Sequence, residues 1–119
     1  MQDYRKLKVW QKAHNLVIHI YQSTARFPRE EVFGITSQIR RASTSIAANI
    51  AEGCGRGTNA DFARFVSMGL GSANEVEYFL TLSADLGFLS AALHQSLLAE
   101  IVEVRKMLYS IRRKIVDKS

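Results

Sequence analysis

The 119-residue sequence contains only one cysteine, one proline and three histidines. A single thiol, Cys54, can form neither an internal disulfide nor a multi-cysteine metal site, which is typical of a chain in the reducing cytoplasm. The lone proline, Pro28, leaves long stretches uninterrupted and favours helices over a turn-rich strand fold. The N-terminus lacks the apolar segment of a secretory signal, and no charge-free run is long enough to span a bilayer. We therefore expect a cytoplasmic protein with no membrane contact.

Residue patterns that support catalysis or cofactor binding are also missing. No glutamate is followed three residues later by a histidine, although a di-iron bundle requires such pairs. No arginine lies four to six residues before His14, His19 or His94, as it would in helical ribonucleases that pair these residue types. The glycine-rich loop at residues 53–57 (GCGRG) follows an expected helix rather than a strand, unlike a P-loop. We expect no enzymatic activity, no metal and no cofactor.

What the sequence does contain is apolar periodicity. Hydrophobic residues make up 47% of the chain and charged residues 23%, which suits one packed domain over residues 1–119. Apolar side chains recur every three or four residues in four segments, which predicts helices at approximately residues 7–25, 30–52, 58–86 and 90–117. Short connections between long helices predict an all-α, antiparallel up-down-up-down four-helix bundle.

Local signals set the ends of these helices. Phe27-Pro28 ends the first, because the residue before a proline is pushed out of the helical region. Glu30 and Glu31 suit the start of the second, whose predicted left-handed stop is Gly53. Thr58 is the expected N-cap of the third helix, which stops at Gly87. The fourth helix carries a coiled-coil-like apolar seam of Leu93, Leu97, Ile101, Val104, Leu108, Ile111 and Ile115.

The second predicted helix has three distinct faces. Its core face consists of Ile35, Ile39, Ala42, Ile46 and Ile50. A polar stripe of Gln38, Arg41, Ser45, Asn49 and Glu52 lies beside that face, and Thr44, Ala47, Ala48 and Ala51 cover most of the remaining side. Residues 42–51 carry no charge, and neither do residues 65–74 of the third helix. A helix on the outside of a monomeric bundle should show charged residues to water, and these two do not.

Glycines inside the third helix add to this observation. A glycine in a helix interior costs about 1 kcal/mol relative to alanine, so Gly69 and Gly71 indicate close approach of another backbone. Either the four helices of one chain pack tightly, or the second and third helices also pack against another subunit. We favour the second interpretation and expect a closed ring, with Arg41 paired to Glu52 or Glu75 across the contact. The expected interface and structural residues are Gln38, Arg41, Ser45, Ala47, Asn49, Ala51, Glu52, Gly69, Gly71 and Glu75.

The net charge of +5 lies in residues 1–57, since residues 58–119 are neutral overall. An antiparallel bundle places the start of the first helix near the end of the fourth, so their basic residues can share one end. This end is either a solvated surface or, repeated around a ring, a surface that binds RNA or DNA phosphates with little sequence preference. No motif interleaves aromatic residues with these cations. The candidate nucleic-acid-binding residues are Lys6, Lys8, Lys12, Arg56, Arg105, Arg112, Arg113 and Lys114.

Four segments carry a family resemblance: VWQKAHNL, RFP, FGITSQIRRASTSIAANIAEGCGRG and FARFVSMGLGSANEVE. In this order they resemble the four-helix bundle proteins encoded in 23S rRNA intervening sequences and the related accessory variability determinant of diversity-generating retroelements. The resemblance implies a ring-shaped homopentamer and, for the retroelement relatives, a surface that binds nucleic acid and a reverse transcriptase partner. The matching positions, for which it implies structural rather than catalytic roles, are Gln38, Arg40, Arg41, Asn49, Glu52, Gly53, Gly55, Arg56, Gly71, Ser72 and Glu75.

Two functional hypotheses follow. The first is a non-enzymatic, homo-oligomeric bundle, pentameric by resemblance, that binds RNA or DNA through basic phosphate contacts. The alternative is a protein-interaction scaffold that touches no nucleic acid and presents its surface to a reverse transcriptase or another protein.

Overall fold

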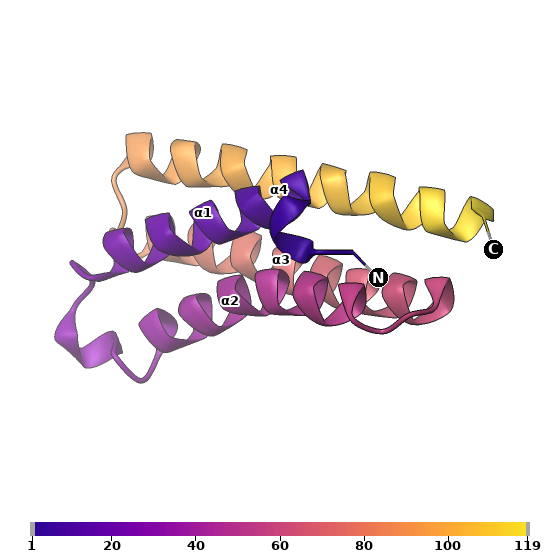
Figure 1. Ribbon diagram of the computed structural model, residues 1–119. Helices are drawn as coiled ribbons and strands as arrows, with labels where there is room; N and C mark the ends of the chain where they lie inside the picture. The colour runs from indigo at the N-terminus through magenta and orange to yellow at the C-terminus, as the bar shows by residue number, and fades with distance from the viewer. Residues whose placement is uncertain (1, 119) are drawn as a thin grey trace.

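Four antiparallel α-helices make up most of the computed structural model, which describes residues 2–118. They are α1 (Lys8–Thr24), α2 (Ile35–Cys54), α3 (Asn59–Asp85) and α4 (Ala91–Lys118), preceded by the 3-10 turns η1 (Tyr4–Lys6) and η2 (Arg29–Glu31). Each helix packs against the helices before and after it, and α4 closes the bundle against α1 (Figure 1). The described residues include no strand, so the predicted all-α four-helix bundle is confirmed. None of these helices is long and apolar enough to cross a membrane.

The core lies along the bundle axis. All five apolar residues on the predicted core face of α2 are buried, as is most of the α4 seam. The exceptions are Ile111, which is half-buried, and Leu93, whose side chain is 37% exposed. The core at that end is closed instead by Leu89 and by Phe27 and Phe88, whose ring centroids lie 5.5 Å apart.

The second helix starts later than the sequence indicated. Residues 29–31 form the separate turn η2, the chain turns again at residues 32–34, and α2 begins only at Ile35. Glu31 lies outside α2 but still caps its first turn, because the Glu31 Oε1 atom accepts a hydrogen bond from the backbone N–H of Ile35 at 3.3 Å. As a result Val32 and Phe33 lie outside any helix and are 49% and 93% exposed.

The glycine loop after α2 also differs from the prediction. Gly53 is helical rather than a left-handed stop, and the residue with positive φ is Gly57, at 89°. A Cβ atom on Gly53 would lie 2.9 Å from Phe62 Cδ1 and 3.0 Å from Phe65 Cβ. Gly53 is therefore required by the close approach of α3, while Gly57 turns the chain. Thr58 then caps α3 as predicted, because its side chain accepts the Asp61 backbone N–H at 3.2 Å.

Gly87 ends α3 as expected, and its replacement tests the left-handed geometry. Its φ is 80°, and the Gly87 and Phe88 amides donate to the carbonyls of Ala84 and Ser83 at 3.0 and 2.9 Å. We expect Gly87→Ala to lower the free energy of unfolding by about 1–2 kcal/mol, because an L-residue is strained in this region. Gly55→Ala is the matched control, since Gly55 has a φ of −87° that alanine adopts freely. Urea denaturation of both variants measures the difference, and equal stabilities would contradict the assignment.

Candidate nucleic-acid interface

The second half of α4 carries a shallow basic groove on its outer side. Its lining residues are Lys106, Tyr109, Ser110, Arg112, Arg113 and Val116. Steps of three and four residues along one helix place these side chains on a common surface, away from the apolar seam of the same helix. The lining includes three cations and no acidic residue. The groove is therefore a local concentration of positive charge.

Arg112 organises this groove. Its guanidinium carbon lies 5.0 Å from the centroid of the Tyr109 ring, and Nη1 donates to Ser67 Oγ of α3 at 3.3 Å. These contacts fix the planar guanidinium while leaving other N–H groups available, which suits bidentate recognition of a phosphate. Among the side chains that the structure describes, no carboxylate lies within ion-pair distance of Lys106, Arg112 or Arg113.

Tyr109 supplies an aromatic surface that sequence reasoning missed. The ring is 48% exposed and sits between the cations, so it offers a stacking platform for an unpaired base. Lys106 was missed as well. The signal was present in the spacing of Lys106, Tyr109 and Arg112–Arg113, which repeats every three or four residues, and it corrects the view that no aromatic residue accompanies the cations.

The other predicted basic residues do not join this groove. Arg105 forms an ion pair with Glu77 of α3, and Lys12 of α1 pairs with Glu103 of α4 at 2.9 Å. Arg56 Nη2 lies 3.5 Å from Glu52 Oε1, and its guanidinium rests over the Phe65 ring. These three cations are locally neutralised, which weakens their expected role in phosphate binding.

The remaining predicted cations lie elsewhere. Lys114 lines a cavity at one end of the bundle together with Leu7, so the start of α1 and the end of α4 lie at the same end, although α4 extends further (Figure 1). Lys6 and Lys8 lie in η1 and at the first residue of α1 and are exposed. The eight predicted residues therefore do not form one patch.

The polar stripe of α2 is paired within a single chain. Arg41 Nη2 donates to Glu75 Oε2 of α3 at 3.0 Å and to Gln38 Oε1 at 3.2 Å. The hydroxyl oxygens of Ser45 and Ser72 are 2.8 Å apart, and Asn49 Nδ2 donates to the Ser45 carbonyl at 2.8 Å. The ion pair expected between subunits thus joins α2 to α3 of the same subunit, and Glu52 pairs with Arg56 instead. These polar groups need no second chain to satisfy them.

The two interior glycines of α3 have different surroundings. Gly69 is buried, but a Cβ atom there would lie 3.8 Å from Leu108 Cδ1 and 3.9 Å from the Ile46 carbonyl oxygen of α2, which is ordinary van der Waals contact, so an alanine would fit. Gly71 is exposed and has nothing within 4 Å of its Cβ position. On α2, Ala47 and Ala51 are half-buried and Ala48 is exposed. Packing within one chain therefore requires glycine at neither position.

The histidines and the cysteine occupy separate environments. His14 stacks on Trp10 with ring centroids 4.9 Å apart, and His19 Nδ1 lies 2.8 Å from Glu100 Oε1. His94 is at the other end of the bundle from Cys54. Burial raises the pKa of the Cys54 thiol, which favours its protonated form. Within the part of the chain that the structure describes, no three histidine, cysteine, aspartate or glutamate side chains are grouped as metal ligands.

The structure defines the class of this chain as an antiparallel four-helix bundle. The family model of the 23S rRNA-intervening sequence protein matches residues 5–110, and the chain belongs to this family. The match includes the polar stripe of α2 and most of α4, and it ends just before Arg112 and Arg113. The family expected from the sequence is therefore confirmed.

A solved structure supports the same fold. The chain is similar to the crystal structure of a protein with unknown function from the S23 ribosomal protein family of Bacteroides thetaiotaomicron VPI-5482. The two share 30% sequence identity and a TM-score of 0.79, over 87% of this chain and 97% of the other. A comparison with curated proteins gave no match.

Proposed function

We propose that this chain is a non-enzymatic, homo-oligomeric bundle that binds RNA or DNA through the α4 groove. The observation that carries the proposal is the convergence of Lys106, Arg112 and Arg113 around the exposed Tyr109 ring, with no acidic residue in the lining. Arginine and lysine side chains on a helix surface contact phosphate oxygens, whereas reading a sequence requires contacts to base edges. We therefore expect affinity for nucleic acid with little sequence preference.

Salt dependence tests this proposal directly. Filter binding of labelled single-stranded and duplex RNA, and of DNA, across a series of salt concentrations measures the affinity and its slope. Three cations per groove predict a log–log slope of roughly −2 to −3 when one subunit binds, because each neutralised phosphate contributes about −0.7 to −0.9. An assembly that engages several grooves at once would give a steeper slope. No measurable affinity at about 50 mM salt, or affinity that is indifferent to salt, would rule out the proposal.

A closed homopentameric ring is the second part of the proposal. Its support on the molecule is a set of exposed apolar and small residues on the outer sides of α2 and α3. Met68 and Tyr78 are 47% and 60% exposed on either side of the open Gly71, and Ala48 is exposed on α2. A repeated heterologous contact of this kind closes into a ring when the rotation allows it. The number five rests on the family resemblance alone.

Light scattering checks the assembly. A pentamer would have a mass close to five times the chain mass of 13.4 kDa, whereas a stable monomer at micromolar concentration would contradict the ring. Assembly also affects the function, because several grooves on one particle bind a long nucleic acid with greater avidity than a single groove.

One observation favours the alternative function, a scaffold for a protein partner. Phe33 is 93% exposed and Val32 is 49% exposed in the connection between η2 and α2. Exposed apolar side chains of this size are typical of protein contacts when they are grouped. A pull-down with and without nuclease distinguishes the two functions, since a protein partner, a reverse transcriptase included, survives the nuclease and a nucleic-acid bridge does not. A cytoplasmic location, like the absence of catalysis, stays a prediction.

A further inference from the structure

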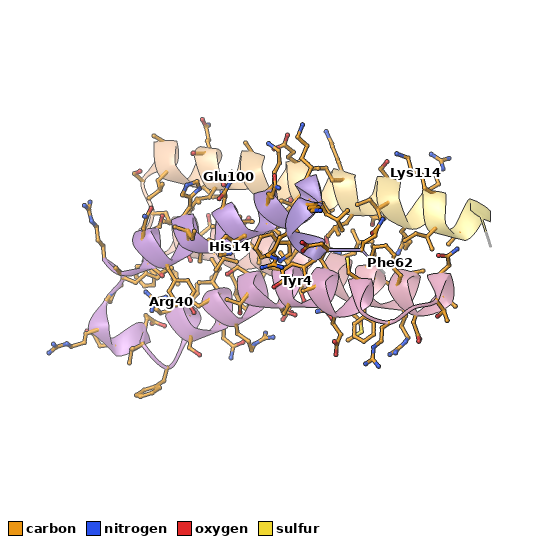
Figure 2. All side chains as sticks on the ribbon, in the orientation of Figure 1. Tyr4, His14, Arg40, Phe62, Glu100 and Lys114 are labelled. Atoms are coloured by element: carbon orange, nitrogen blue, oxygen red, sulfur yellow. The ribbon has the colours of Figure 1, made fainter. Side chains whose placement is uncertain are left out.

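The bundle has an open end because α1 is shorter than its neighbours. At this end α4 and the connection between α2 and α3 continue past the start of α1, and only the N-terminal segment lies at the fourth corner (Figure 1). A cavity of about 350 Å³ results, which is within the size range of small-molecule sites. Phe62 and Lys114 mark the same end of the bundle in Figure 2. The lining residues are Gln2, Leu7, Gly53, Cys54, Gly57, Thr58, Asn59, Phe62, Ile111, Lys114 and Ile115.

The wall of this end cavity is mainly apolar. Leu7 comes from the segment before α1, Phe62 from α3, and Ile111 and Ile115 from α4. The buried thiol of Cys54 completes the wall from α2 and behaves there as a small apolar group. A wall built from all four sides of the bundle favours a compact apolar ligand over an extended peptide.

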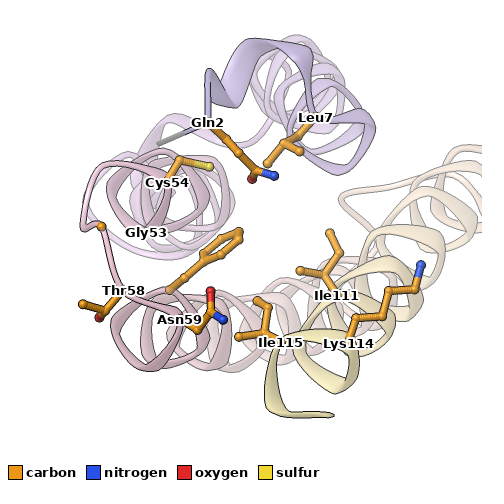
Figure 3. Close-up of a pocket in the computed structure, with 11 residues that line it drawn as sticks. Gln2, Leu7, Gly53, Cys54, Thr58, Asn59, Ile111, Lys114 and Ile115 are labelled. Carbon is orange, nitrogen blue, oxygen red and sulfur yellow. The ribbon is translucent and has the colours of Figure 1, made fainter. Parts of the chain in front are cut away.

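The mouth of the end cavity is polar and favours negative charge. Lys114 lies at its edge on α4, and Thr58 and Asn59 place the positive end of the α3 dipole beside it (Figure 3). None of the eleven lining residues is acidic, and among the described side chains no carboxylate lies within ion-pair distance of Lys114. The nearest first-turn carboxylate of α3, Asp61, is engaged with Arg64 at 3.5 Å.

We propose that the end cavity binds a small anionic amphiphile with one carboxylate on a short apolar tail. The tail lies against Leu7, Phe62 and Ile111, and the carboxylate meets the Lys114 ammonium group at the mouth. This chemistry differs from that of the α4 groove, whose lining does not include Lys114 and whose cations face a phosphate backbone. The site is independent of the proposed nucleic-acid binding, so either can fail without the other.

Calorimetric titration with decanoate, below its micelle-forming concentration, tests the site. We expect saturable binding of one decanoate per chain, with an affinity about tenfold lower for Lys114→Gln, because a charge-assisted hydrogen bond is lost. Decanol has the same tail without the charge and should bind about tenfold more weakly than decanoate. The absence of binding, or equal affinity of decanol and decanoate, would overturn the proposal.

A blocked cavity provides a second test. Ile111→Trp places a larger side chain into the cavity and should abolish decanoate binding, whereas Ile18→Trp, at a 41% exposed position of α1, should leave it unchanged. A further measurement uses the unmodified chain. Decanoate should slow the alkylation of Cys54, because this thiol lines the end cavity. Decanoate binding that persists in Ile111→Trp, or alkylation of Cys54 at the same rate with and without decanoate, places the ligand elsewhere and overturns the proposal.

Discussion

Replacing Arg112 and Arg113 together by glutamine is expected to weaken binding of single-stranded RNA by about 10- to 100-fold at about 0.1 M salt. Both side chains line the α4 groove, and each loses a charge-assisted contact to a phosphate. The salt slope should fall by about one for each cation removed, and the loss should be similar for unrelated sequences. Fluorescence anisotropy at several salt concentrations measures both quantities. The fold should persist, because Arg113 is exposed and Arg112 contacts only the side chains of Ser67 and Tyr109 at the surface.

The matched control removes the same charge at the other end of the bundle. Arg26 and Arg29 are exposed and lie just after α1 and in η2, far from the second half of α4 (Figure 1). Arg26→Gln with Arg29→Gln should leave the affinity within about threefold, since charges separated by several Debye lengths are screened. If the two double variants lose affinity equally, binding follows net charge rather than the groove. A separate replacement, Tyr109→Ala, should weaken binding of single strands more than of duplexes, because only unpaired bases stack.

Ala48→Glu is expected to dissociate the assembly into folded monomers. Ala48 is exposed on the uncharged outer face of α2, so glutamate there costs the isolated chain little. In a subunit contact the same carboxylate would be buried without a partner, which costs several kcal/mol and exceeds what a contact of ordinary size tolerates. Sedimentation velocity at micromolar concentration would show a shift from the oligomer to the monomer, and circular dichroism would show unchanged helicity.

Two further replacements make this test specific. Ala99 is exposed on α4, which is diagonally opposite α2 because neither helix packs against the other. Ala99→Glu should therefore keep the oligomer. Gly71→Ala distinguishes the two interpretations of the interior glycine: in a monomer it should raise the free energy of unfolding by about 1 kcal/mol through helix propensity alone. In a ring that packs against Gly71 it should weaken assembly, and a stabilised, fully assembled variant would remove Gly71 from the contact.

The fold could be predicted from the sequence wherever the apolar spacing along one helix or a single helix cap determines the local structure. The spacing of Ile39, Ile46 and Ile50 marks a buried stripe whichever helices cover it, and Thr58 and Gly87 act within their own turns. The left-handed residue of the loop GCGRG could not be predicted in this way, because the loop contains three glycines and local propensity does not distinguish them. Packing of Phe62 and Phe65 against Gly53 selects Gly57 as the left-handed residue, and that contact is tertiary.

The candidate site was less predictable for a related reason. Arg105 and Lys106 are adjacent, yet a step of 100° around α4 turns the first toward Glu77 and leaves the second in the groove. Which of the two is neutralised depends on the position of α3, and the sequence of α4 contains no information about it. Arg41 shows the same dependence, since its partner Glu75 lies 34 residues away on a helix whose register is set by packing.

The helices of the bundle do not contact one another to the same extent, and this difference affects which helix unfolds first. The α2–α3 hairpin has the most extensive interhelical contact and carries the Ser45–Ser72 hydrogen bond. The shorter α1 is fastened to α4 at its surface by solvent-exposed pairs such as Lys12–Glu103, which add little stability. We therefore expect local unfolding to start at α1, so that amide protons there exchange with solvent sooner than those of the hairpin. Because Leu7 directly precedes α1, each such opening would also remove one wall of the end cavity and widen its mouth.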